Sequence, residues 1–295
     1  MEARFGRVLT AMITPFTGDG SLDLTGAATL ARWLVEQGND GLVVAGTTGE
    51  SPTLTHDEQV GLVAAVVDAV EVPVVAGAGS NDTEAAVELT RRCTQAGAAG
   101  ILTVTPYYNR PSQAGLVAHF SAVAGATDLP VMLYDIPPRS GRKIETGTIL
   151  RLADEVENIV AVKDAAGDVG ETARLVAAAP DGFEVYSGDD ALTLALLAVG
   201  AVGTVSVASH WTTPETVALM EKFFGGDPAG AREANRRMLA SYAFESSETA
   251  PNPVPTKVMM RVLGLPGGDC RPPMGPEPDG LADRAREILV GLGRG

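Results

Sequence analysis

The sequence predicts an α/β protein, a closed (β/α)8 TIM barrel with a C-terminal helical appendage. Short apolar runs rich in Val and Ile recur, and each is followed by a loop and a stretch with helical spacing of apolar residues. Near-continuous apolar strands that alternate with helices indicate a parallel sheet covered on both faces. Eight such units occupy roughly the first 225 residues, which favours a closed barrel over an open sheet.

The eight units are placed by their apolar runs and by the helical patterns between them. The strands are expected at 8–14, 41–45, 72–76, 100–104, 131–134, 159–163, 183–186 and 203–207. The helices are expected at 25–37, 56–70, 83–96, 113–126, 146–153, 169–178, 190–199 and 214–224.

The pattern of alternating strands and helices ends at Gly225, and the rest of the chain contains helical stretches with no strand between them. We therefore expect two parts, a barrel with the active site at 1–225 and a C-terminal helical region at 226–295. The segment 267–280 is rich in Pro and Gly and is predicted to be an ordered loop or linker.

Composition narrows the possible partners. The formal net charge is -15, which argues against binding to nucleic acid or to an anionic membrane. Two cysteines do not make a disulfide framework, and the first 16 residues lack the pattern of a signal peptide, so a cytoplasmic location is expected. The uncharged stretch 191–209 is broken by Gly200 and Gly203, and we interpret it as a buried helix leading into a buried strand.

The first candidate for chemistry is Lys163, which ends the apolar run 159–163. Barrels of this kind build their active sites at the carboxyl ends of the strands. A lysine in a dry pocket has its pKa lowered from about 10.4, and its neutral amine can attack a carbonyl. Lys163 could therefore form a Schiff base, although a solvated strand edge or an ion pair would also explain its position.

Three further loops follow strands of the same rim. The loop 46–51 reads Gly-Thr-Thr-Gly-Glu-Ser and could hold a carboxylate, or could be a turn that caps the next helix. Tyr107 and Tyr108 follow the fourth strand, where packing is the alternative. Tyr134 ends the fifth strand, and Arg139 beyond it suits a substrate carboxylate or a surface salt bridge.

Together these positions supply the parts of a lysine aldolase. Lys163 would form an imine with a ketone, and Tyr134 would move protons to and from the intermediates. Hydroxyls such as Thr47 and Tyr108 would relay those protons. A carboxylate site beside the ketone makes the substrate a 2-oxo acid.

No metal and no cofactor are expected. The histidines His56, His119 and His210 are dispersed without metal-ligand spacing, which disfavours a zinc-dependent aldolase. The segment 187–190 reads Ser-Gly-Asp-Asp and places carboxylates where many barrels bind phosphate, so a sugar phosphate is disfavoured.

In its motifs and their order the chain resembles the dihydrodipicolinate synthase family of pyruvate-dependent lysine aldolases. The resemblance covers nearly the whole length. Its motifs are Thr14-Pro15-Phe16, Gly46-Thr47-Thr48-Gly49-Glu50-Ser51, Thr105-Pro106-Tyr107-Tyr108-Asn109, Tyr134-Asp135-Ile136-Pro137, Val162-Lys163, Ser187-Gly188-Asp189-Asp190 and Asn252-Pro253-Val254-Pro255.

The resemblance implies a reaction, the condensation of pyruvate with aspartate 4-semialdehyde toward diaminopimelate and lysine. It makes Lys163 the Schiff-base residue and Tyr134 the centre of a proton relay, with Thr47 on one side and Tyr108 of a neighbouring subunit on the other. It implies that Thr48 and the backbone at Val205 hold pyruvate, that Gly188 lines the pocket and that Arg139 receives the semialdehyde carboxylate. A homotetramer, a dimer of tight dimers, is implied as well.

One position departs from the family pattern. Lysine-inhibited members carry a glutamate that helps to bind the effector, and Ala85 stands at the corresponding position here. Ser51, His56, Asn81 and Tyr107 remain, so this site would be partly intact. Inhibition by lysine is therefore expected to be weak or absent.

Two other functions are compatible with parts of the pattern. A pyruvate lyase acting on sialic acid or on a 2-keto-3-deoxy sugar acid would keep the imine chemistry, but Arg139 favours the semialdehyde. A non-catalytic barrel that binds a small acid would not need Lys163, Tyr134, Thr47 and Tyr108 together.

Overall fold

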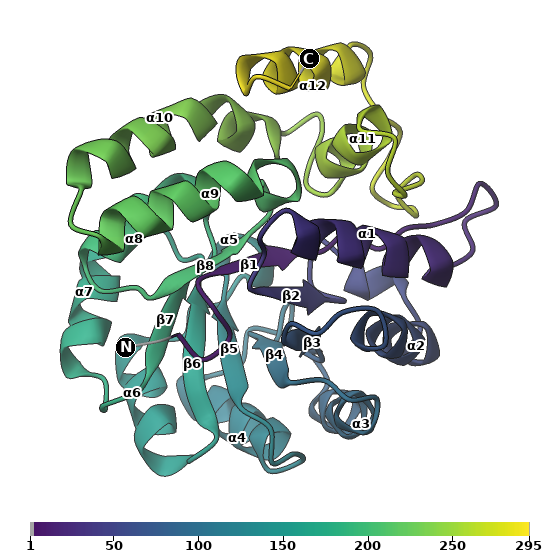
Figure 1. Cartoon of the computed structure of the whole chain (residues 1–295). Coiled ribbons are helices and arrows are strands. Elements are labelled where there is room, and N and C mark those ends of the chain that lie inside the picture. Colours follow the sequence, from purple (N-terminus) through teal and green to yellow (C-terminus); the bar gives the residue numbers. More distant parts are fainter. Residues whose placement is uncertain (1–2, 295) are drawn as a thin grey trace.

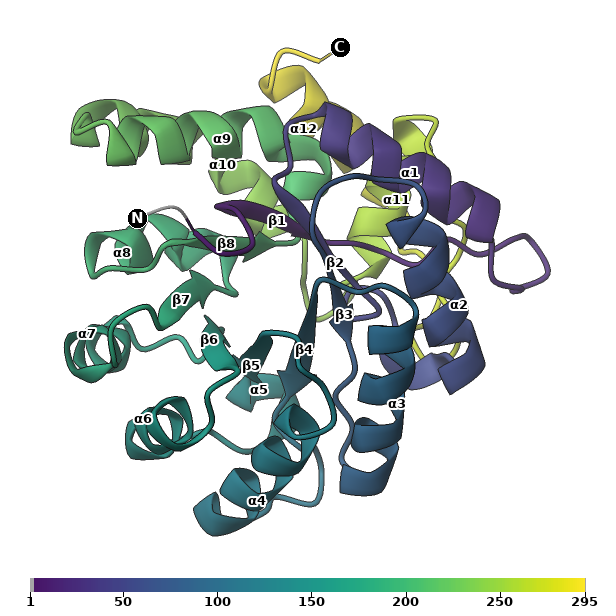
Figure 2. The same cartoon turned by 60° about the horizontal axis from the view of Figure 1, so that its bottom comes forward.

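The computed structural model describes residues 3–294, and its centre is a closed barrel of eight parallel strands. Figure 1 shows the whole chain, and Figure 2 shows the strands inside a circle of helices. Each strand pairs with the next along the chain, and β1 pairs with β8 to close the ring. The strands are β1 Val8–Ala11, β2 Gly41–Val44, β3 Val74–Gly77, β4 Gly100–Val104, β5 Val131–Asp135, β6 Ile159–Asp164, β7 Glu184–Ser187 and β8 Gly203–Ser206.

Eight helices cover the outside of the barrel, one after each strand. They are α1 Leu24–Glu36, α2 His56–Val67, α3 Thr83–Gln95, α4 Gln113–Ala124, α6 Thr146–Glu155, α7 Val169–Ala178, α8 Thr193–Ala198 and α9 Ser209–Phe224. Short helices occupy some of the loops: η1 Ser51–Thr53, α5 Pro137–Ser140 and η2 Asp190–Leu192. Three more helices follow the barrel: α10 Pro228–Phe244, α11 Val254–Val262 and α12 Leu281–Gly291.

The predicted barrel and its order of strands and helices are confirmed. The strand predicted at 8–14 ends at Ala11 and the helix predicted at 56–70 ends at Val67, and two further helices differ more. The helix predicted at 214–224 begins at Ser209, so Pro214 lies inside it. In its first turn the Ser209 N–H donates to Ser206 Oγ and the Thr212 N–H donates to the Ala208 carbonyl, both at 2.9 Å, so these backbone donors are satisfied before the chain reaches Pro214, which has no N–H. The helix predicted at 190–199 is divided into η2 and α8, and the side chain of Asp189 caps η2.

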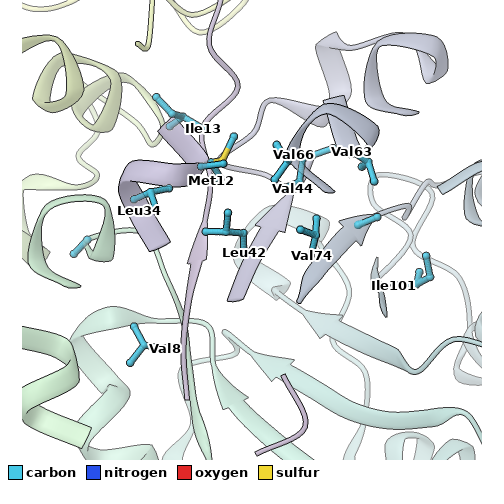
Figure 3. Close-up of a cluster of buried hydrophobic side chains, with 14 of the residues drawn as sticks. Val8, Met12, Ile13, Leu34, Leu42, Val44, Val63, Val66, Val74 and Ile101 are labelled. Atoms are coloured by element: carbon cyan, nitrogen blue, oxygen red, sulfur yellow. The ribbon is translucent and has the colours of Figure 1, made fainter. Parts of the chain in front are cut away.

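Two hydrophobic clusters stabilise this architecture. One fills the inside of the barrel with strand residues two positions apart, such as Met132 and Tyr134, because alternate side chains of a strand face the same way. The other lies between the strands and the helices, and Figure 3 shows part of it around β1–β4, α1 and α2. The outer cluster also takes in residues of the C-terminal helices, including Met238, Met259 and Leu289.

A shift of register in β6 decides which side chains face the barrel interior. Val131 pairs with Ile159, but the next pair is Met132 with Ala161, so β6 contains one extra residue at this point. As a result Tyr134 pairs with Lys163, two positions further along both strands. Without the extra residue, Lys163 would lie opposite Asp135 and would face away from the interior.

The uncharged stretch 191–209 contains α8 and β8, and β8 is buried as predicted. The helix predicted to be buried is buried on one face only, because Thr193, Leu196 and Leu197 are buried whereas Ala195 and Ala198 are exposed. Within residues 3–294 no helix combines the length and the apolar character needed to span a membrane.

Candidate active site

Lys163 and Tyr134 lie side by side at the carboxyl ends of β6 and β5. Both side chains are buried, and Lys163 Nζ lies 4.3 Å from the centre of the Tyr134 ring. No ion pair within residues 3–294 involves Lys163, so its amine is not committed to a carboxylate. This arrangement places an amine and a phenol where both could act on one small molecule.

Residues at the ends of the neighbouring strands leave room for Lys163 and hold Tyr134 in place. A β-carbon at Gly188 would lie 2.9 Å from Lys163 Cγ and 3.0 Å from its Cε, so only glycine leaves room for the lysine stem. The backbone N–H and the hydroxyl of Thr105 both donate to the Tyr134 carbonyl at 3.0 Å. Val205 is buried in the same inner cluster as Tyr134.

The outward-facing residues that follow the pair secure the loops. Asp135 accepts from the Ile144 N–H and from Lys143 Nζ, both at 3.0 Å. Asp164 accepts from the Ala166 N–H at 2.9 Å and from the Thr172 hydroxyl at 2.6 Å. Burial raises the pKa of Asp135, and these donors oppose that rise. Thus each strand that carries a candidate catalytic residue ends in a carboxylate that holds its outgoing loop.

The loop 46–51 is tightly folded at the end of β2. Ala45 and Glu50 both have positive φ angles, 57° and 56°, which are unusual for residues other than glycine. Gly49 allows close backbone packing, because a β-carbon there would lie 3.1 Å from the Ala45 backbone and from the Met12 carbonyl. Thr47 is partly exposed on this loop, whereas Thr48 is buried.

A buried ion pair attaches this loop to the C-terminal region. Lys257 Nζ of α11 lies 2.6 Å from Glu50 Oε1, and each side chain is 2% exposed. The Arg271 N–H donates to Glu50 Oε2 at 2.9 Å, and Lys257 Nζ donates to the Asp269 carbonyl at 3.0 Å. Burial lowers the pKa of Lys257, and the Glu50 carboxylate opposes that change.

Replacing Lys257 by methionine is expected to lower the free energy of unfolding by about 3–5 kcal/mol, because the Glu50 carboxylate would stay buried without its partner. The double variant Glu50→Gln/Lys257→Met should regain most of that loss, since no buried charge remains. Urea unfolding followed by circular dichroism measures both values.

Arg261→Met on the same helix is the matched control. Its ion pairs with Asp269 and Glu277 involve a half-exposed guanidinium, so its effect should stay within about 1 kcal/mol. If Lys257→Met and Arg261→Met lowered the free energy of unfolding equally, the buried ion pair would stabilise the fold no more than the exposed one does.

The other two predicted residues lie at the surface of this chain. Tyr108 is 89% exposed and has a φ of +73°, and its N–H donates to the Ser140 carbonyl at 3.2 Å. Arg139 is exposed on α5, and its guanidinium donates to the Asn252 carbonyl at 3.5 Å. The structure therefore brings Lys163, Tyr134, Gly188 and Val205 together around the barrel interior and leaves Tyr108 and Arg139 outside that group.

The two buried histidines have structural partners. His210 Nε2 accepts the Ile13 N–H at 3.0 Å, and His119 Nδ1 lies 2.9 Å from the Thr83 hydroxyl. Burial lowers the pKa of each imidazole to about 4. In the part of the chain from 3 to 294, no group of three or more His, Cys, Asp or Glu side chains is arranged to hold a metal ion.

Sequence reasoning did not assign a role to Asn252 or Lys257, which both contact the loop 46–51. The sequence does mark Lys257 as unusual, because it is a lysine within the apolar stretch that becomes α11. All residues of α11 from 254 to 260 are buried. The contact of Asn252 with Thr48 spans 204 positions of the chain and leaves no local pattern.

The closed barrel and the buried lysine and tyrosine at the carboxyl ends of its strands are features of an aldolase-type lyase that acts through a Schiff base. A model of the dihydrodipicolinate synthetase family matches residues 4–289, and the chain belongs to this family.

Named relatives agree with this assignment. The chain is 52% identical to 4-hydroxy-tetrahydrodipicolinate synthase of Acidothermus cellulolyticus over 99% of this chain and 94% of that protein. It is 50% identical to the enzyme of the same name from Moorella thermoacetica, over 92% of each chain. The crystal structure of the dihydrodipicolinate synthase from Cyanidioschyzon merolae with lysine bound matches with a TM-score of 0.96 and 42% identity, covering 99% of this chain and 100% of that one.

Proposed function

We propose that this protein is a 4-hydroxy-tetrahydrodipicolinate synthase, which condenses pyruvate with L-aspartate 4-semialdehyde in the biosynthesis of diaminopimelate and lysine. The observation that carries the proposal is the buried Lys163 amine, 4.3 Å from the Tyr134 ring at the carboxyl ends of β5 and β6. Family membership and two relatives of that name at 50% and 52% identity support the choice of substrates.

The reaction begins at Lys163. Its amine attacks the ketone carbon of pyruvate, and the resulting carbinolamine loses water to give the imine. Loss of a methyl proton converts the imine into an enamine, whose carbon attacks the aldehyde of the second substrate. Tyr134 gives and takes the protons of these steps, and Thr47 and Tyr108 connect it to other proton carriers. No cofactor is required.

The carboxylate of pyruvate is held at the loop 46–51. We assign its binding to Thr48 and to the backbone at Val205, with Gly188 lining the space beside the Lys163 stem. Thr48 is buried at the end of β2, Val205 lies in the inner cluster, and Gly188 would clash with Lys163 if it carried a side chain. These contacts place the ketone of pyruvate near the lysine amine.

Arg139→Ala is expected to raise the KM for the semialdehyde about 10- to 100-fold, because a guanidinium binds a carboxylate through charge-assisted hydrogen bonds. The KM for pyruvate should change less than threefold. Arg142→Ala, in the loop that follows α5, is the control and should leave both constants nearly unchanged. Steady-state kinetics with each substrate varied in turn measure the two KM values. Equal effects on both would count against the assignment of Arg139 to the semialdehyde carboxylate.

We also propose a cytoplasmic homotetramer built as a dimer of tight dimers. The support from this chain is Tyr108, a residue that is 89% exposed although its backbone is held in a positive-φ conformation. A partner subunit would cover this ring and receive it at its own active site. Sedimentation of the active protein should report a tetramer, and a fully active monomer would contradict this part of the proposal.

The choice of second substrate is tested by turnover. With pyruvate present, L-aspartate 4-semialdehyde should be consumed, whereas N-acetylneuraminate should not be cleaved at a comparable rate. Cleavage of the sugar acid without use of the semialdehyde would assign the chain to the sugar-acid lyases instead.

A further inference from the structure

We infer that Asn252 is a positioning residue for the pyruvate end of the site, where it fixes the direction in which the Thr48 hydroxyl donates its hydrogen. The inference rests on the proposed function, since it names what prepares Thr48 to bind the carboxylate. It assigns a role in pyruvate binding to the segment between α10 and α11, which lies outside the barrel.

Asn252 is buried and is held through both its backbone and its side chain. Its N–H donates to Ser246 Oγ at 3.2 Å, and its carbonyl receives the 3.5 Å contact from Arg139. Its side-chain Nδ2 donates to Thr48 Oγ1 at 3.0 Å. One residue thus connects Thr48, assigned to pyruvate, with Arg139, assigned to the second substrate.

The direction of the Thr48 contact has a chemical consequence. A hydroxyl has one hydrogen to donate and two lone pairs to accept. Because Thr48 Oγ1 accepts from Asn252, its hydrogen is not used on the asparagine. No other hydrogen bond of this oxygen is formed within residues 3–294. Thr48 can therefore direct its only hydrogen at a substrate carboxylate, which accepts hydrogen bonds and cannot donate them.

The opposite arrangement would remove this ability. If the asparagine presented its carbonyl to Thr48, the hydroxyl would donate to Asn252 and would offer only lone pairs to an anion. In the structure Asn252 Oδ1 has no hydrogen-bond partner among the described residues and is buried. Aspartate at this position can only accept when ionised, so Asn252→Asp imposes the opposite arrangement with almost no change of shape.

Pyruvate binding is measured by trapping. Wild-type protein and variants are incubated with increasing pyruvate, reduced with borohydride, and assayed by mass spectrometry for the fraction of chains that carry an adduct. We expect Asn252→Ala to raise the half-saturating pyruvate concentration roughly tenfold, the effect of losing the one hydrogen bond that orients the Thr48 hydroxyl. Asn252→Asp should raise it on the order of 100-fold, because it reverses the hydrogen bond and adds a negative charge near the substrate carboxylate.

Three controls separate positioning from a loss of folding. Asn235→Asp on α10 makes the same chemical change elsewhere in the C-terminal region and should leave the half-saturating concentration unchanged. The kcat of Asn252→Ala at saturating pyruvate and semialdehyde should stay within about threefold of wild type. In a Thr48→Val background, Asn252→Ala should have no further effect on pyruvate binding, because the two residues act through one hydrogen bond.

The outcomes distinguish this inference from the proposed function. If wild-type protein forms no adduct, the proposed function fails. If wild type forms the adduct and Asn252→Asp binds pyruvate as wild type does, the function stands and the role of Asn252 is overturned. Additive effects of Asn252→Ala and Thr48→Val would overturn it as well.

Discussion

Lys163→Ala is expected to lower kcat/KM by at least about a thousandfold, because the variant has no amine with which to form the imine. Lys163→Arg should be equally inactive, since it keeps a positive charge but offers no nucleophile at neutral pH. Both variants should remain folded, because no ion pair within residues 3–294 involves Lys163 and its replacement leaves no buried carboxylate without a partner. Steady-state turnover and circular dichroism measure the two properties.

Lys222→Ala is the matched control for this prediction. Lys222 is half-exposed on α9 and lies 3.7 Å from Asp227, and its replacement should leave turnover within about twofold of wild type. Substantial activity in Lys163→Arg would contradict the imine mechanism and would indicate that a positive charge is sufficient.

Tyr134→Phe is expected to lower kcat about 100- to 10,000-fold, the range for loss of a general acid-base group. The substitution keeps the ring that lies against Lys163 Nζ and removes only the hydroxyl. Because no hydrogen bond of that hydroxyl is formed within the described residues, the free energy of unfolding should change by less than about 1 kcal/mol.

Tyr186→Phe on β7 provides the comparison, since Tyr186 belongs to the same inner cluster. The Tyr186 hydroxyl donates to Glu184 at 2.8 Å and accepts the Phe5 N–H at 3.3 Å. Its loss should therefore reduce stability by about 1–3 kcal/mol and leave kcat largely intact. Similar kcat values for the Tyr134→Phe and Tyr186→Phe enzymes would contradict the proton-transfer role of Tyr134.

The fold could be predicted because barrel strands and their covering helices leave strong local patterns. A strand buried on both faces is an apolar run in the sequence. Eight such runs separated by stretches with helical spacing are compatible with few folds other than a (β/α)8 barrel. Local patterns failed at Ser209, where a helix begins five residues before Pro214. The hydrogen bond from the Ser209 N–H to Ser206 Oγ, which supports that early start, lies within the turn and leaves no apolar period.

The candidate site could be predicted in part. Lys163 and Tyr134 are marked by their positions at the ends of apolar runs, but their pairing depends on the extra residue in β6. A bulge has no reliable signature in a single sequence, because the strand keeps its apolar residues on either side of it.

The contacts that the C-terminal region makes with the site could not be predicted, although Lys257 stands out as a lysine within an apolar helical stretch. Glu50 and Asn252 look like an ordinary loop glutamate and an ordinary turn asparagine. Their partners, Lys257 and Thr48, are about 200 residues away along the chain, so only the folded structure connects them.

The central claim is that Lys163 forms an imine with pyruvate. The direct measurement is borohydride reduction of the protein in the presence of pyruvate, followed by proteolysis and mass spectrometry of the peptides. One adduct on the peptide that contains Lys163, absent when pyruvate is omitted, is the expected result. No adduct, or an adduct on another lysine with Lys163 unmodified, would contradict the claim.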